Sequence, residues 1–194
     1  MKKNKTIIAA VVLLLVFMVG GAIAYFTDTD SATNTFTIGD IDISIHEDHW
    51  VAADGLNLMP GETVAKDPVI KNDSANNPAY VFAEVEVPCT TEATPQQLFS
   101  YSVNSGWTQL SSTACAAGKA TYVYYYGSDG SLQSLAAGAT TTNPVFSEVT
   151  LLSTLKGDEA GINDNLNIVV NGYGIQAEGL PQNSTPTTVW GLFS

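Results

Sequence analysis

Residues 79–87 carry the clearest periodicity in the chain. This segment, AYVFAEVEV, has two alternating sets of positions, which are Val81, Ala83, Val85 and Val87 on one side and Tyr80, Phe82, Glu84 and Glu86 on the other. Successive side chains of a strand point to opposite faces, so the alternation predicts a β-strand with one fully apolar face. Pro88 follows and is expected to end the strand, because proline cannot donate a hydrogen bond to a ladder.

Shorter segments of the same kind follow one another, separated by turn signals. Strands are expected at 36–45, 56–59, 62–70, 99–103, 107–110, 121–126, 145–152 (where a strand fits better than a helix) and 166–175. Pro60-Gly61 predicts a type II turn, and Asn104-Ser105-Gly106 a hairpin-like turn. Thr185 is expected to cap a short helical turn that begins with Pro186. Many short strands with turns at near-regular spacing predict an all-β antiparallel sandwich.

The N-terminus has the three parts of an export signal. Lys2, Lys3 and Lys5 form a basic region, residues 7–19 are uninterruptedly apolar, and Ala22-Ile23-Ala24 is a small-x-small cleavage site. We therefore expect residues 1–24 to be a signal peptide that is cut between Ala24 and Tyr25. The alternative is a retained anchor, because the apolar run up to Ala24 is long enough to cross a bilayer of roughly 30 Å as a helix.

The segment after the expected cut is suited to an extended conformation. Residues 25–38 are rich in threonine and contain neither proline nor glycine. Beyond Gly39, where we expect a bulge or bend, three isoleucines alternate with polar residues at positions 40–45, as in a half-buried strand. The expected organisation is thus a signal peptide (1–24), an N-terminal segment (25–38) and a sandwich domain (39–194).

Charge restricts the partners of the secreted chain. The sequence has seven lysines, no arginine and 19 acidic residues; three of the lysines precede Tyr25, so residues 25–194 carry a formal charge of −15. This balance disfavours binding to nucleic acid and to anionic lipid. If subunits assemble, backbone hydrogen bonds and apolar burial must outweigh their repulsion, and salt should help by screening.

Cys89 and Cys115 are the two cysteines of the chain. An exported protein meets an oxidising environment, so we expect them to form an internal disulfide, with a pair of free thiols as the alternative.

Five segments, taken in order, resemble the TasA/camelysin family of secreted proteins from Gram-positive bacteria. They are AYFTDTDSATNTF (24–36), FTIGDIDI (36–43), LMPGETV (58–64), YVFAEVEV (80–87) and IVVNGYGIQAEGL (168–180). The resemblance implies a jelly-roll sandwich, processing by a dedicated signal peptidase, and a role in the fibres of the biofilm matrix. It also implies that the cleaved N-terminus acts as a donor strand for a neighbouring subunit. The residues that would take this role are Tyr25, Phe26, Ala32, Phe36 and Ile38.

The donor face is only partly apolar, because Asp28 and Asp30 fall on the same face as Phe26, Ala32 and Phe36. These acids and the pair Asp40 and Asp42 are fragments of a calcium motif at most, since the glycine and terminal glutamate of a calcium loop are missing.

Camelysin-type members are classed as metalloproteases, so the resemblance raises the question of a zinc site. The histidines stand as His46-Glu47-Asp48-His49, whereas the helical zinc motif needs His-Glu-x-x-His; Trp50 occupies the place of the second histidine. Phosphate-loop and nucleophile-elbow motifs are also missing from the sequence. We expect no enzyme, no cofactor, no metal site and an ordinary polar loop at 46–50.

We therefore interpret the chain as a secreted structural protein of the extracellular matrix or cell surface, with other copies or related fibre subunits as partners. The alternative is an anchored, monomeric adhesin that binds carbohydrate through Tyr122, Tyr124 and Tyr126. For these three rings we favour cross-strand packing within the sandwich or a subunit contact over carbohydrate stacking.

Overall fold

The computed structural model describes residues 41–156, 166–181 and 183–193. The chain divides into two units, Met1–Ile38 and Gly39–Ser194, and every described residue belongs to the second. Several predictions therefore lie outside the described residues: the signal peptide, its cleavage site at Ala22, Ala24 and Tyr25, the donor strand at Tyr25, Phe26, Ala32, Phe36 and Ile38, the bend at Gly39, and the acids Asp28, Asp30 and Asp40.

The described chain is almost entirely β-structure, as predicted. Its elements are β1 (Ile43–His46), a 3-10 helix η1 (Ala52–Gly55), β2 (Thr63–Ala65), β3 (Val69–Asn72), β4 (Ala79–Pro88), β5 (Phe99–Ser100), β6 (Trp107–Ala116), β7 (Lys119–Ser128), β8 (Ser131–Leu132), β9 (Glu148–Leu151), β10 (Val169–Gln176) and α2 (Pro186–Trp190). Within these residues no helix is long and apolar enough to span a membrane.

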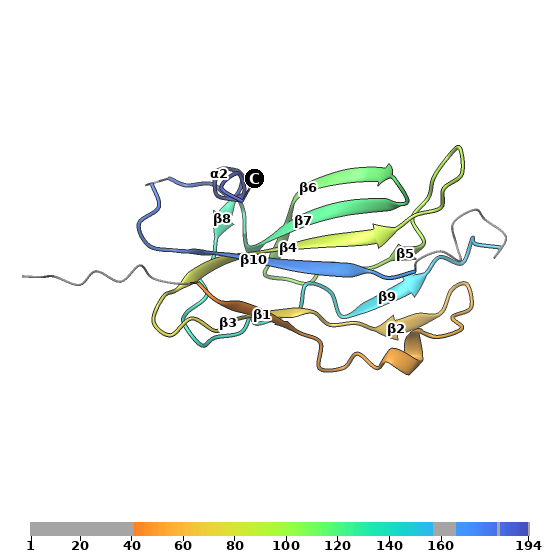
Figure 1. The fold of residues 1–194 in the computed structure, drawn as a ribbon, viewed down its shortest axis with the longest axis horizontal. Coiled ribbons are helices and arrows are strands. Elements are labelled where there is room, and N and C mark those ends of the chain that lie inside the picture. The colour runs from red at the N-terminus through yellow and green to blue at the C-terminus, as the bar shows by residue number, and fades with distance from the viewer. Residues whose placement is uncertain (1–40, 157–165, 182, 194) are drawn as a thin grey trace, which may run out of the picture. The chain divides into compact units, whose positions relative to one another are not determined.

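The first layer of the sandwich is an antiparallel sheet in the order β10-β4-β7-β6, with β8 paired to β7 (Figure 1). Its centre is the alternating segment. One face of β4 is fully buried in the main core, through Val81, Ala83, Val85 and Val87. On the other face, Phe82 joins a second apolar cluster with Tyr125 and Val189, and this cluster is covered by α2 and the chain after it. Thr185 caps α2 and Pro186 begins it, as predicted.

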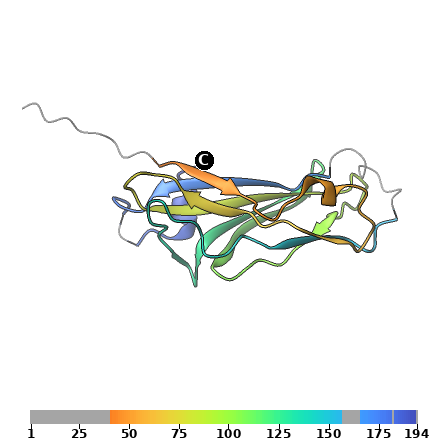
Figure 2. The ribbon, with the colours of Figure 1, turned by 90° about the horizontal axis from the view of Figure 1, so that it is seen from below.

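The second layer consists of β1 paired with β3, and of β2, β9 and β5 in the order β2-β9-β5. Backbone bonds join these two groups: Thr141 N donates to Ile70 O (2.9 Å) and Val145 N donates to Pro68 O (2.9 Å). In Figure 1, β1, β3, β9 and β2 lie on the β10 side of the first sheet, and Figure 2 shows the same ribbon turned by 90°. The main core lies between the layers, where Ile70, Leu98 and Phe146 are completely buried.

Three local predictions differ from the structure. The strand expected at 62–70 is divided into β2, which pairs with β9, and β3, which pairs with β1. The segment expected to be a strand at 56–59 is irregular chain that follows η1. The turn predicted at Pro60-Gly61 is present: Glu62 N donates to Met59 O (2.9 Å), and Gly61 has φ +91°. The strand expected at 99–103 is limited to β5, which pairs with β9, while β6 pairs with β7. The turn at Asn104–Gly106 therefore carries the chain from one sheet to the other and closes no hairpin.

Candidate assembly edge

On one side of the sandwich, two regular edge strands lie next to each other. Among the described residues, β10 pairs only with β4, and β1 pairs only with β3. Both ladders are antiparallel and neither has a register shift. An edge strand of this kind presents unpaired N–H and C=O groups that can recruit another strand.

The alternation of backbone direction identifies which groups of β10 face outward. Ala177 N donates to Pro78 O (2.9 Å), continuing the register in which Gln176 lies opposite Ala79. In an antiparallel ladder, alternate residues direct their backbone groups to the partner strand. The backbone groups of the other set therefore face away from β4, and this set consists of Val170, Gly172, Gly174 and Gln176.

The same reasoning applies to β1. Asp73 N donates to Asp42 O (2.8 Å) in register with the Ile43–Asn72 pair, so Ile43 and Ile45 direct their backbone groups away from β3. Their side chains point the opposite way from those of Ser44 and His46 and pack against the main core. The side chains of Ile43 and Ile45 lie over Gly172 and Gly174 of β10, which have no side chains and so leave room for them.

The composition of β10 leaves its edge unprotected. The strand is eight residues long, VVNGYGIQ, and contains neither proline nor a charged residue. On the opposite side of the sandwich, β6 has register shifts between Gln109 and Ser111 and between Thr113 and Ala116, and β5 is two residues long. Bulges and short strands are the ordinary means of blocking an edge. The β10 side is thus the better acceptor for an added strand.

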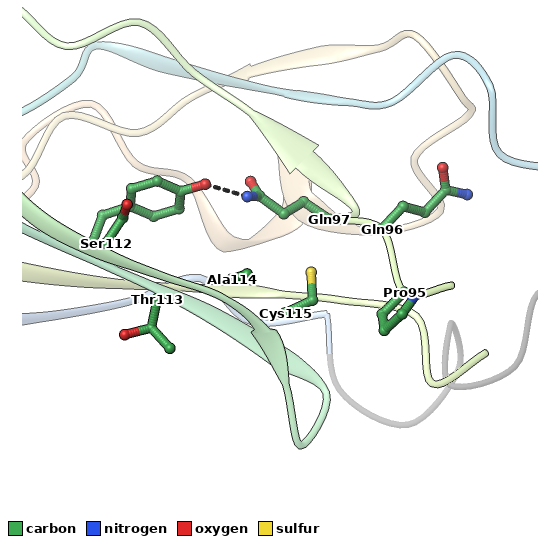
Figure 3. A pocket seen from close by; sticks show the side chains of 8 residues that line it. Pro95, Gln96, Gln97, Ser112, Thr113, Ala114 and Cys115 are labelled. Atoms are coloured by element: carbon green, nitrogen blue, oxygen red, sulfur yellow. Dashed lines mark hydrogen bonds between the residues drawn. The ribbon is translucent and has the colours of Figure 1, made fainter. Parts of the chain in front are cut away.

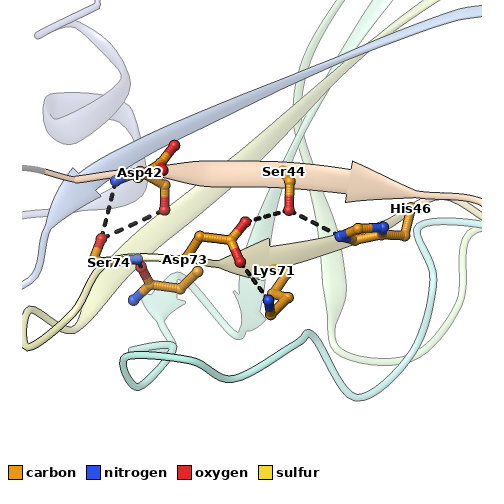
Figure 4. Close-up of polar contacts among 7 residues, drawn as sticks. Asp42, Ser44, His46, Lys71, Asp73 and Ser74 are labelled. Atoms are coloured by element: carbon orange, nitrogen blue, oxygen red, sulfur yellow. Dashed lines mark hydrogen bonds and ion pairs between the residues drawn. The ribbon is translucent and has the colours of Figure 1, made fainter.

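A polar cluster fixes β1 onto β3 on the solvent side of the layer (Figure 4). The Ser44 hydroxyl donates to Asp73 Oδ2, His46 Nε2 lies 2.9 Å from Ser44 Oγ, and Lys71 Nζ forms an ion pair with Asp73 Oδ1. The hydrogen bond from Lys71, followed by that from Ser44, lowers the pKa of Asp73. In this arrangement the Ser44 hydroxyl donates its proton to the Asp73 carboxylate, and the cluster links β1 to β3.

The two histidines of the chain do not share a site. His49 Nδ1 lies 2.6 Å from Asp67 Oδ2, and its backbone N donates to Asp67 Oδ1 (3.1 Å). This hydrogen bond and the charge of Asp67 raise the pKa of His49. The ring nitrogens of His46 and His49 thus have different partners on different segments. Nowhere in the described ranges do three His, Cys, Asp or Glu side chains gather to hold a metal ion. The residues present do not fit a histidine-based zinc centre.

The alternative surface role of the tyrosine row is wrong for two of its members, which pack inside the sandwich. Tyr124 and Tyr126 are 2% and 3% exposed, and both belong to the main core. Tyr124 lies 2.9 Å, hydroxyl to hydroxyl, from Tyr101, and the Tyr126 hydroxyl lies 3.0 Å from that of Thr142. This face of β7 is covered by the second layer, so the rings pack within the sandwich. Tyr122 is half-buried and lies at the margin of the core.

Cys89 and Cys115 form the disulfide that the sequence predicted. It joins the chain directly after β4 to β6. The sequence analysis did not single out Gly172 and Gly174. It interpreted segment 166–175 only as a strand, although a glycine in a strand leaves space that a neighbouring side chain can fill. The alternate spacing of the two glycines, which places both on one face, was the available signal.

Comparison with known families gives a match over the N-terminal part of the chain. Residues 1–93 match the family model described as camelysin metallo-endopeptidase. Neither a curated protein nor a solved structure matches the chain. The resemblance to the TasA/camelysin family is therefore confirmed over residues 1–93.

Proposed function

We propose, from the camelysin family match of residues 1–93, that this protein is a secreted structural subunit that forms or joins extracellular fibres. The observation that carries the proposal is the β10 edge, which is regular, uncharged and unpaired among the described residues. In this proposal, residues 25–38 of one subunit add to the edge beside β10 of the next. Backbone hydrogen bonds then provide affinity, and side-chain contacts set the register.

Such a contact joins two different surfaces, so it is heterologous and can be repeated from subunit to subunit; it generates a filament when the rotation between successive subunits does not close a ring. The backbone groups of β10 that face away from β4 supply the hydrogen-bond donors and acceptors that an added strand requires. The lack of charge on β10 also matters, since the donor segment contains Asp28 and Asp30 and the whole chain is acidic. We expect moderate salt to favour assembly by screening the repulsion between subunits.

The first test compares two purified proteins, residues 25–194 and residues 39–194, by negative-stain electron microscopy and sedimentation at low and moderate salt. The longer protein should form filaments, and the shorter one should remain monomeric because it lacks the donor segment. Filaments of equal abundance from both proteins would contradict the donor role of residues 25–38.

The second test concerns the acceptor edge and uses matched proline substitutions in residues 25–194. Gln176→Pro removes an outward-facing N–H of β10 without removing a bond to β4, and it should reduce or abolish filaments. Gln109→Pro is the control: Gln109 is exposed, and Gly127 N donates to Gly106 O (2.8 Å), which by alternation directs the N–H of Gln109 away from β7. The control should assemble normally. Loss of assembly in the control alone would place the acceptor on the β6 side.

Cleavage of the signal would act as the switch, because a segment still joined to Ala24 is tethered and cannot add to a neighbour. In producing cells, Ala24→Asp should block the cut and leave few extracellular fibres. Identical fibres from cells that produce the wild type and from cells that produce Ala24→Asp would show that cleavage is not required.

We further propose that the chain is not a peptidase, despite the name of the matched family. The separate hydrogen-bond partners of His46 and His49 support this view. The test is a peptide-cleavage assay with purified residues 25–194, with and without a chelator. Cleavage that the chelator abolishes, and that His46→Ala removes, would overturn the proposal.

A further inference from the structure

Two hollows adjoin each other around the disulfide. The larger, of about 470 Å³, is lined by residues 95–97, by residues 112–115 of β6 and by Tyr122 of β7. The smaller, of about 260 Å³, is lined by residues 90–92, Pro95 and residues 115–118. Because Pro95 and Cys115 line both, the two hollows adjoin, and we call them together the disulfide groove.

Among the described residues, those that line the larger hollow include no charged side chain, and their polar groups are amides and hydroxyls. Gln97 reaches from the loop toward β7, where its Nε2 donates to the Tyr122 hydroxyl (Figure 3). Ser112 and Thr113 add hydroxyls from β6. Amides and hydroxyls both donate and accept hydrogen bonds, as the hydroxyls of a sugar do, and a tyrosine ring provides a flat surface for its carbon face.

The loop that forms one wall of the groove is held in place by the fold. The disulfide ties Cys89 to Cys115, and Leu98 N donates to Pro88 O (2.8 Å). Within the loop, Thr90 N donates to Gln96 O (2.9 Å), and Gln96 N donates to Thr90 Oγ1 (3.1 Å). A wall fixed before binding reduces the ordering cost of holding a ligand.

We propose that the disulfide groove binds a neutral polysaccharide chain. Two adjoining hollows can hold neighbouring sugars of one polymer, and the amides and hydroxyls of the larger hollow suit uncharged sugars. An acidic polymer is disfavoured by the net charge of −12 and by Glu92 in the smaller hollow. The groove lies on the β6 side of the first layer, at the opposite end of the strand order from β10. Filament growth at β10 would therefore leave it accessible, and the proposal does not depend on filament formation.

The test measures fluorescence anisotropy of fluorescein-labelled oligosaccharides from dextran, levan and laminarin, mixed with residues 25–194. Acidic oligosaccharides from alginate serve as the comparison. We expect at least one neutral probe to bind and the alginate probe not to bind. Tyr122→Leu should weaken binding roughly tenfold by removing the ring face. Gln97→Ala should weaken it severalfold, and Gln109→Ala, an exposed β6 position outside the groove, should leave it unchanged.

Near-UV circular dichroism and thermal unfolding of Tyr122→Leu separate loss of binding from loss of folding, and Gln97→Ala tests the groove without changing the core. Three results would overturn the proposal: none of the neutral probes binds, only alginate binds, or a neutral probe binds the Tyr122→Leu and Gln97→Ala variants as well as it binds the wild type.

Discussion

Ile43 of β1 lies directly over Gly174 of β10: a Cβ built at Gly174 would stand 2.8 Å from Cγ2 of Ile43. Real Cβ atoms are essentially never this close to another atom. The two strands belong to different layers, and the absence of a side chain at position 174 lets the layers close at this side. Gly174 therefore sets the distance between β1 and β10, and β10 is the edge that we propose as the acceptor.

Gly174→Ala should destabilise the fold, because the added methyl group forces β1 away from β10. Overpacking of this kind costs roughly 1–3 kcal/mol in the free energy of unfolding. Urea unfolding followed by tryptophan fluorescence measures the change. Gly172→Ala is the matched comparison: its nearest contacts would be at 3.3 Å, so it should cost less. Equal stability of wild type and Gly174→Ala would show that β1 can shift without loss.

Removing the disulfide should destabilise the protein without changing its fold. The bond links cysteines 26 residues apart, and the chain-entropy model gives roughly 3 kcal/mol for such a loop. The double substitution Cys89→Ser with Cys115→Ser should lower the urea midpoint accordingly. Wild type in a reducing agent provides the control and should show the same shift. Unchanged midpoints in both cases would mean that the loop is held without the bond.

Stability should fall at alkaline pH because of Tyr101. Burial, followed by the hydrogen bond to Tyr124, raises the pKa of Tyr101 well above its ordinary value of about 10. The unfolded chain then loses this proton at lower pH than the folded chain, so the stabilising contribution is complete below about pH 10 and is lost as pH rises further. Urea midpoints across this range should fall less steeply for Tyr101→Phe. Equal slopes would indicate that Tyr101 ionises in the folded state.

His49 should titrate at a higher pH in the folded protein than in the unfolded chain. The hydrogen bond to Asp67 raises the pKa of His49 from 6.5. Its stabilising contribution is therefore complete below the unfolded pKa and is lost as pH rises through the folded value. The contribution is small, because the His49 side chain is 79% exposed. NMR titration of the ring proton should give a lower pKa in Asp67→Asn, and identical values would rule out the pairing in solution.

Local features were predictable from the sequence because their physical cause lies within a few residues. The alternation at 79–87 identified β4 and its buried face, since side chains of a strand alternate regardless of the partner strand. Pro60-Gly61 identified a turn because it depends on the φ values of those residues. Thr185 and Pro186 identified the start of α2 because a helix cap is completed within one turn.

Other features depended on which segment covers which face, and this was decided only by the tertiary structure. The row Tyr122, Tyr124 and Tyr126 has the same sequence whether it faces solvent or a second sheet; the second layer buries Tyr124 and Tyr126. The Asn104–Gly106 turn is compatible with a hairpin, yet β5 and β6 join different sheets. The sequence by itself determined that this chain forms strands and where most of them lie, whereas the pairing of its cysteines was an expectation that the structure confirmed. The tertiary structure alone decided that Gly174 faces Ile43 and that β10 is an unprotected edge, because those relationships arise from contacts between residues far apart in the chain.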